Sequence, residues 1–212
     1  MIKNISTENR WIGVLIILHF VGLIGLSLPE FRHLFLPLTP VNLLLTLVAF
    51  YKVNSDFSGK LLLLSFLIFL IGFSVEAIGV ETGILFGNYA YGSPFGFKIF
   101  DTPVMIGVNW LFLALSSYGI VQFFTKKAFW LIVLPPILMV GLDFLVEPVA
   151  MKLGFWGWEN DIIPIQNYIM WFVTSLFIHV IIHWFSPKIN SKISFVIFGT
   201  QTVFFAVLNF VI

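Results

Sequence analysis

The stretch LLLLSFLIFLIGFSVEAIGV at residues 61–80 decides the fold, because its only charged side chain is that of Glu76. A helix rises about 1.5 Å per residue and must cross about 30 Å of hydrocarbon, so an apolar run of this length is typical of a membrane span. The whole chain of 212 residues agrees, since 59% of it is apolar and 10% is charged. Soluble domains carry about a quarter charged residues. The sequence therefore excludes a soluble protein and predicts an integral membrane protein.

Six further runs of similar length, bounded by charge, proline or glycine, bring the expected number of spans to seven. They predict an all-α fold, a polytopic helix bundle that forms a single membrane domain over residues 1–212. Pro37 and Pro40 make the second run the weakest, so a re-entrant segment is the alternative there. The first run is expected to be a retained helix, because no small-residue cleavage site follows it. The expected spans are Trp11–Leu28, Leu34–Tyr51, Leu61–Val80, Pro103–Phe124, Ala128–Glu147, Ile165–Phe185 and Ile193–Ile212.

Basic residues are shared unevenly between the two sides of these spans. Eight lysines and arginines fall on the side of the N-terminus, and three fall on the other side. The positive-inside rule then predicts a cytoplasmic N-terminus and an outer C-terminus, in what we expect to be a prokaryotic cytoplasmic membrane. The long loops 81–102 and 148–164 share the outer face, where their Gly, Trp, Tyr and Asn residues favour a functional site.

Composition also excludes several function classes. A net charge of +1 offers nucleic acid no attraction, and the lack of cysteine excludes thiolate metal sites and cysteine nucleophiles. His179 and His183 share a helical face, but no HExxH motif or carboxylate companion accompanies them, so we interpret them as core histidines. Four histidines are too few for a membrane di-iron oxygenase, and the last span lacks the lysine that retinal requires. We expect neither a metal nor a cofactor.

Two hairpins of the predicted bundle share their residue spacing. Trp110 follows Pro103 by seven residues, as Trp171 follows Pro164. Both hairpins run in the same direction, so the pattern indicates a parallel repeat about the membrane normal. The alternative is a chance match in a sequence with 18% aromatic residues. The other matched sets, offset by 67 residues, are Glu76, Tyr89 and Tyr91 in the first hairpin and Asp143, Trp156 and Trp158 in the second.

Three carboxyl groups lie within the predicted spans, where an ionisable group costs about 2.5 to 3.5 kcal/mol on insertion scales. Glu76 lies near the outer end of its span, and Asp143 and Glu147 are four residues apart, on one helical face. No lysine or arginine lies within either span, so one of the acids is expected to stay protonated near neutral pH. Solvation at the helix ends is the alternative, above all for Glu147. The pattern favours a proton-transfer site.

Pro135 and Pro136 stand about two turns before Asp143 in the fifth span. A proline pair removes two backbone donors, so we expect it to kink or break the helix there. Such a break either is an ordinary membrane kink or widens a cavity beneath Asp143.

Several motifs in the middle of the chain resemble the carotenoid biosynthesis protein family, whose members include cofactor-independent carotenoid 1,2-hydratases. The resemblance covers about residues 70–175. Leu85 and Glu147 depart from the family pattern, which more often has proline and aspartate there. The flanking spans match the family only as hydrophobic helices. The motifs are EAIGVETG at 76–83, FGNYAY at 86–91, DFLVEP at 143–148, WGW at 156–158 and PIQNYIMW at 164–171.

The resemblance implies hydration of the terminal C=C, the ψ end, of an acyclic or monocyclic carotenoid. An acid protonates one alkene carbon, and a base directs water onto the tertiary carbocation that results. We assign Asp143 as the acid, Glu76 as the base and Glu147 as their support, although the first two roles can be exchanged. The substrate enters from the bilayer, and water comes from the outer side. The residues expected to contact the substrate are Tyr89, Tyr91, Trp110, Trp156, Trp158, Asn167 and Trp171.

Two other functions fit the same residues. In a cyclase, an internal double bond rather than water captures the carbocation. A transporter or lipophile-binding protein would instead use the parallel repeat without chemistry. The aromatic pairs are ambiguous in the same way, because they suit either an aromatic belt at the membrane surface or the stabilisation of a cation.

Overall fold

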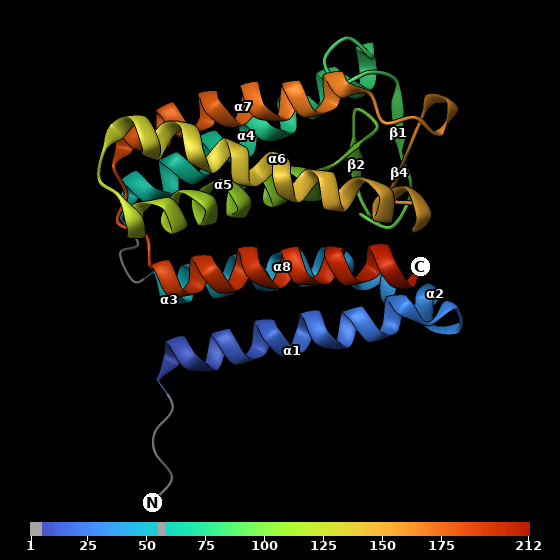
Figure 1. Cartoon of the computed structure of the whole chain (residues 1–212), viewed down its shortest axis with the longest axis horizontal. Helices are drawn as coiled ribbons and strands as arrows, with labels where there is room; N and C mark the ends of the chain where they lie inside the picture. The colour runs from blue at the N-terminus through green and yellow to red at the C-terminus, as the bar shows by residue number, and fades with distance from the viewer. Residues whose placement is uncertain (1–5, 55–57) are drawn as a thin grey trace, which may run out of the picture.

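The computed structural model describes residues 6–54 and 58–212, and within them seven helical segments are long and apolar enough to cross a membrane. The predicted all-α polytopic bundle is confirmed (Figure 1). The segments are α1 (Thr7–Ser27), the composite run Pro29–Val53, α4 (Gly59–Thr82), α5 (Val104–Phe124), α6 (Ala128–Lys152), α7 (Ile165–Phe185) and α8 (Ser191–Val211).

Local sequence signals set where several of these helices begin and end. The side chains of Ser6 and Ser58 accept hydrogen bonds from backbone N–H groups of the first turns of α1 and α4. Asn190 does the same for α8. These caps satisfy donors that a helix leaves unpaired at its N-terminus. Gly83 ends α4 in the left-handed region, with φ of 67°, a conformation that glycine adopts without steric cost.

The second span consists of four helical pieces. The 3₁₀ turns η1 (Pro29–Phe31) and η2 (Leu36–Leu38) flank the short α2 (Arg32–Phe35), and α3 (Thr39–Val53) completes the run. Prolines in the first positions of η1, η2 and α3 account for this segmentation, because proline cannot donate to the preceding turn. The run of 25 residues is nevertheless long and apolar enough to cross, which favours a span, and the re-entrant alternative stays a prediction.

The proline pair does not break α6. This helix continues from Ala128 to Lys152 with Pro135, Pro136 and Pro148 inside it. The alternative of a helix break that widens a cavity beneath Asp143 is therefore wrong, whereas the ordinary kink stays a prediction. Neighbouring helices in a membrane bundle can tolerate the two missing donors, and both Pro135 and Pro136 are buried against them.

Helix α5 forms the centre of the bundle. In its most apolar 18-residue stretch 78% of the residues are buried, a larger share than in any other of the seven described spans. It packs against α3, α4, α6, α7 and α8, while α1 packs against α3 and α8. In Figure 1, α1 lies along one edge, α3 and α8 form the next layer, and the remaining helices lie beyond them. The layer of α3 and α8 packs directly on α5, and α8 also packs on α6.

The two long loops lie at the end of the bundle where α8 finishes, as Figure 1 shows. They contain β1 (Tyr89–Tyr91), β2 (Lys98–Ile99), β3 (Thr102–Pro103) and β4 (Trp156–Trp158). Strands β2 and β3 form a small hairpin, whereas β1 pairs with β4 from the other loop. The prediction that both loops share one side is thus confirmed by the helix order.

Candidate functional site

Strands β1 and β4 hold the loop aromatics on one face. Their antiparallel register places Tyr89 opposite Trp158 and Tyr91 opposite Trp156, around a central pair of Ala90 and Gly157. Side chains alternate along a strand, so the four aromatic side chains point to the same side. Ala90 and Gly157 are exposed on the other side. The aromatic face is turned toward the carboxyl groups of α4 and α6, as their hydrogen bonds show.

Glu76 receives three hydrogen bonds from aromatic side chains. The hydroxyls of Tyr89 and Tyr91 donate to Oε2 of Glu76 at 2.7 and 2.8 Å. Trp110 Nε1 in α5 donates to the other oxygen, Oε1, at 3.0 Å. Only 3% of Glu76 is exposed. Because all three partners donate and none carries a charge, the arrangement suits a buried carboxylate acceptor.

Glu147 has an equivalent set of three donors in the second hairpin. Trp156 Nε1 and Trp158 Nε1 donate to its Oε2 at 2.9 and 2.7 Å. Asn167 Nδ2 in α7 donates to its Oε1 at 3.0 Å. The residue spacing matched Glu76 with Asp143, but the hydrogen bonds make Glu147, one turn further along α6, the counterpart of Glu76.

Asp143 has fewer donors than the other two acids. Asn167 Nδ2 donates to Asp143 Oδ2 at 2.9 Å, so one amide nitrogen bridges Asp143 and Glu147. In the described part of the chain this is the one side-chain hydrogen bond of Asp143, against three each for Glu76 and Glu147. Asp143 is only 2% exposed. Of the three acids, it is the one best suited to carry a proton.

The two tyrosines of β1 stay protonated in this environment. Burial raises the pKa of both Tyr89 and Tyr91 above the ordinary value of a phenol, and the nearby carboxyl of Glu76 adds to the shift. A protonated phenol is a hydrogen-bond donor, as the contacts with Glu76 require. These hydroxyls therefore serve as fixed neutral donors.

Trp110 and Trp171 stack between α5 and α7, with ring centroids 4.2 Å apart and planes inclined by 22°. Trp171 lines the cavity described below, whereas Trp110 does not and instead holds Glu76. A Cβ at Gly72 would lie 2.5 Å from Trp110 Cβ, so glycine is required for Trp110 to approach α4. Gly72 thus belongs to the site, although the sequence carried no signal for it beyond glycine within a span.

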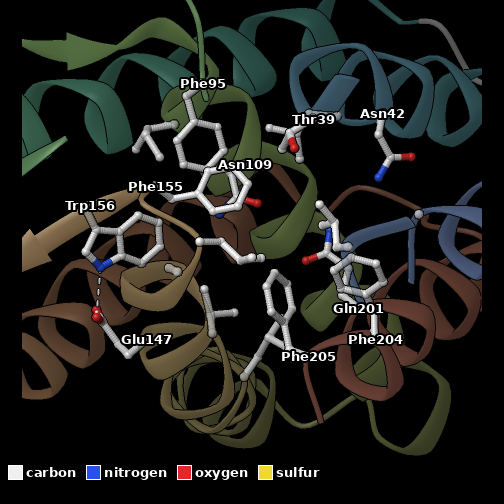
Figure 2. A pocket seen from close by; sticks show the side chains of 18 of the residues that line it. Thr39, Asn42, Phe95, Asn109, Glu147, Phe155, Trp156, Gln201, Phe204 and Phe205 are labelled. Carbon is white, nitrogen blue, oxygen red and sulfur yellow. Dashed lines mark hydrogen bonds between the residues drawn. The ribbon is translucent and has the colours of Figure 1, made fainter. Parts of the chain in front are cut away.

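A cavity of about 260 Å³ lies beside the three acids. The acids and the aromatic face lie at one end, and the remaining wall is mostly apolar, with side chains from α1, α2, α3, α5, α6, α7 and α8. Figure 2 shows Glu147 and Trp156 on one side of the cavity, with Phe204 and Gln201 on the other. Three residues of the cavity wall, in α1, η2 and α3, are exposed and apolar. These residues are Val21, Leu38 and Val41.

The structure brings together nearly all the residues that the sequence singled out. Glu76, Asp143 and Glu147 line one cavity, and Trp110 is joined to it through Glu76. The other predicted contact residues that line it are Tyr89, Tyr91, Trp156, Trp158, Asn167 and Trp171. The substrate-binding and catalytic roles themselves stay predictions.

The histidines lie outside this arrangement except for His19, which lines the cavity. His179 is fully buried, with Nδ1 2.7 Å from Ser175 O and Nε2 3.1 Å from Ala114 O. Over residues 6–54 and 58–212, no three side chains of His, Asp or Glu gather as a metal site would require. His179 is therefore a histidine of the helix core.

Residues 39–212 match the family described as carotenoid biosynthesis protein. The chain belongs to this family. Its matched region contains every helix that carries an acid of the site and excludes α1. The predicted family membership is thereby confirmed.

This chain is similar to a curated protein, the bisanhydrobacterioruberin hydratase of Haloarcula japonica. The two are 27% identical over 118 residues, which cover 50% of this chain and 39% of the relative. No solved structure matches the chain. The comparisons support a carotenoid-modifying role, with a distant hydratase among the relatives.

Proposed function

We propose that this protein hydrates the terminal C=C of an acyclic or monocyclic carotenoid, without a cofactor, by carboxylic acid and carboxylate catalysis. The observation that carries the proposal is the set of three buried acids at one end of an apolar cavity. All their side-chain partners are neutral donors. Proton transfer needs such groups in differing protonation states, and hydration of an alkene needs no other chemistry.

In the first step, protonated Asp143 gives its proton to one alkene carbon. The π electron pair forms the new C–H bond and leaves a tertiary carbocation on the other carbon. The faces of nearby aromatic rings, including Tyr91 and Trp156, line the cavity and attract a cation through their quadrupoles. Asp143 suits the acid role because it has the fewest hydrogen-bond donors of the three acids.

In the second step, a water oxygen bonds to the carbocation while Glu76 accepts a proton from that water. The product is a tertiary alcohol, and the sum of both steps adds one water to the alkene. Transfer of the proton from Glu76 back to Asp143 restores the starting state. Asn167 donates to both Glu147 and Asp143, so Glu147 fixes the orientation of Asp143 through this shared amide. The base and the acid can exchange roles when the reaction runs in reverse.

The cavity holds an end group while the rest of the polyene stays in the lipid. We infer that the end group enters beside Val21, Leu38 and Val41, because these exposed apolar residues line the cavity. Water reaches the acids from the loop side, where β1 and β4 are partly exposed.

We further infer a prokaryotic cytoplasmic membrane as the location, with the acids near its outer face. The eight-to-three distribution of basic residues and the haloarchaeal relative support this placement. Single cysteines introduced at Ser93 and Lys126 should react with an impermeant thiol reagent from opposite sides, with Ser93 reached from outside. Labelling of both from one side would contradict the placement.

Expression in a host that makes lycopene or γ-carotene tests the function directly. Pigment mass spectrometry should show the addition of one water, or of two where both ends react. A pigment of unchanged mass but altered absorption would indicate cyclisation instead. An unchanged pigment in a host with verified membrane expression would contradict hydration of these two substrates.

A further inference from the structure

Three carboxamide side chains line the cavity and make no hydrogen bond to the acid cluster, by which we mean Glu76, Asp143 and Glu147. They are Asn42 in α3, Asn109 in α5 and Gln201 in α8, and we call them the amide cluster. Figure 2 shows Asn42 and Gln201 across the cavity from Glu147 and Trp156. The residues come from three helices that are far apart in the sequence, so their convergence on one cavity is a product of the fold.

None of these side chains has a hydrogen-bond partner in the described parts of the chain, 6–54 and 58–212. Gln201 is only 6% exposed, and Oδ1 of Asn42 is completely buried without a partner. Buried amides are almost always paired, and within a membrane bundle water does not reach them freely. An unpaired cluster of this kind needs an explanation beyond packing.

The chemistry of the cluster restricts what it can bind. The carbonyl oxygen of an amide accepts hydrogen bonds and its NH₂ group donates them. A ligand that both donates and accepts therefore satisfies a carboxamide such as that of Gln201 more fully than a ketone or an ether, which only accept. Among the described residues of the cavity wall, the acids are Glu76, Asp143 and Glu147, His19 is the one imidazole, and no lysine or arginine is present. The ligand at the amide cluster is therefore neutral.

We propose that the amide cluster binds an O–H group, which both donates and accepts. This inference rests on the proposed function and adds a second polar subsite to it. The O–H group has two possible sources: a hydroxyl on the end group of the substrate itself, or the water that takes part in hydration. If the amides bind a substrate hydroxyl, they determine which substrate is accepted. If they bind water, they hold the molecule that is added to the alkene.

The test compares the wild-type protein with Gln201→Leu, Asn42→Leu and the double variant, each purified in detergent. Val203→Leu, an exposed position on the same helix as Gln201, is the matched control. Two substrates are used: lycopene, and a carotenoid whose reacting end group carries one hydroxyl a few carbons from the alkene. Both kcat and KM are measured for each substrate.

The two sources give different results. If the cluster binds a substrate hydroxyl, each variant raises KM for the hydroxylated substrate by about tenfold and leaves lycopene unaffected, since one hydrogen bond is lost. If it binds water, kcat falls for both substrates with little change in KM. Unchanged kinetics for both substrates in the double variant would overturn the inference.

Two further measurements, of the thermal midpoint and of pigment binding, test the inference even if a variant folds poorly or the proposed function is wrong. Leucine in place of an unpaired amide should raise the thermal midpoint, whereas a structural amide would give the opposite sign. Should the wild type hydrate neither substrate, the proposed function fails, and pigment binding decides the inference. The wild type should then retain the hydroxylated carotenoid in preference to lycopene, and the double variant should not. Equal retention by both proteins, together with a thermal midpoint that does not rise in the double variant, would overturn it.

Discussion

The hairpins α4–α5 and α6–α7 each surround a glutamate with three hydrogen-bond donors, but they differ in how many acids they contain. In each hairpin the strand that follows the first helix supplies two aromatic donors, and a residue of the second helix supplies a third. The first hairpin holds Glu76 alone. The second adds Asp143 one turn before Glu147 and joins them through Asn167. Two similar sets of three donors thus surround one acid in the first hairpin and, in the second, an acid that an amide joins to Asp143.

The β1–β4 pairing is what relates the two hairpins. Its central residues, Ala90 and Gly157, are 67 positions apart, the same offset that the residue spacing indicated. An antiparallel pair centred on equivalent residues is what a two-fold axis between the hairpins produces. Apart from tyrosine rather than tryptophan as the strand donor, the hairpins differ in Asp143 and Asn167, and substitutions there should separate the two roles.

The largest effect is expected for Asp143→Asn. The change is close to isosteric, so folding should persist while the proton donor is lost. General acid catalysis contributes about 10² to 10⁴ in rate, and kcat should fall by that amount in a pigment assay. Asp161→Asn, in the exposed loop, is the matched control and should retain activity, because water replaces the lost group.

An intermediate effect is expected for Asn167→Leu, which removes the bridge between Asp143 and Glu147. Hydrogen bonds to charged groups contribute about 1.5 to 3 kcal/mol, so the rate should fall by about 10- to 100-fold. Asp143→Asn combined with Asn167→Leu should be little worse than Asp143→Asn alone. Additive losses in this double-mutant cycle would show that Asn167 does not act through Asp143.

A smaller effect is expected when each hairpin loses one aromatic donor. Tyr89→Phe removes a hydroxyl bonded to Glu76, and Trp158→Phe removes an N–H bonded to Glu147. Two other donors remain in each case, so we expect losses of about tenfold or less. If Glu76 is the base, Tyr89→Phe should lower kcat more than Trp158→Phe does. The reverse order would exchange the roles of Glu76 and Glu147.

The smallest effect concerns stability at high pH. The pKa of Tyr89 and of Tyr91 is raised in the folded state, so above the ordinary tyrosine pKa of about 10 the unfolded state loses protons that the folded state keeps. Stability should therefore fall as the pH rises past about 10. In a double Tyr89→Phe, Tyr91→Phe variant the thermal midpoint should fall less over that range. An identical pH dependence would show that these tyrosines do not ionise on unfolding.

The fold could be predicted in large part because long apolar runs have few alternatives in water or in lipid. Glu76 and Asp143 were found for the same reason, since a charge within such a run stands out. The donors of Glu147 were not, because linear spacing cannot tell which of two acids one helical turn apart meets a given side chain. The alternative of a helix break at Pro135 and Pro136 was wrong, because tertiary packing keeps the helix continuous there.

The amides of the cavity illustrate another limit. Asn42, Asn109 and Gln201 each occur in an apolar run without a motif, and only the packing of three helices shows that they face one space. The pairing of β1 with β4 was similarly hidden, because each strand has three residues and lies in a loop. Long-range contacts of short segments leave little trace in a single sequence.

The most direct test of the account is the origin of the added oxygen. Wild-type protein and Asp143→Asn are incubated with lycopene or γ-carotene in H₂¹⁸O, under anaerobic conditions with a chelator present. The account predicts that the wild-type product gains one heavy oxygen for each hydrated end, and that Asp143→Asn forms almost none. A wild-type product without heavy oxygen, a product that forms only in a parallel incubation supplied with ¹⁸O₂, or wild-type rates in Asp143→Asn would contradict acid-catalysed hydration.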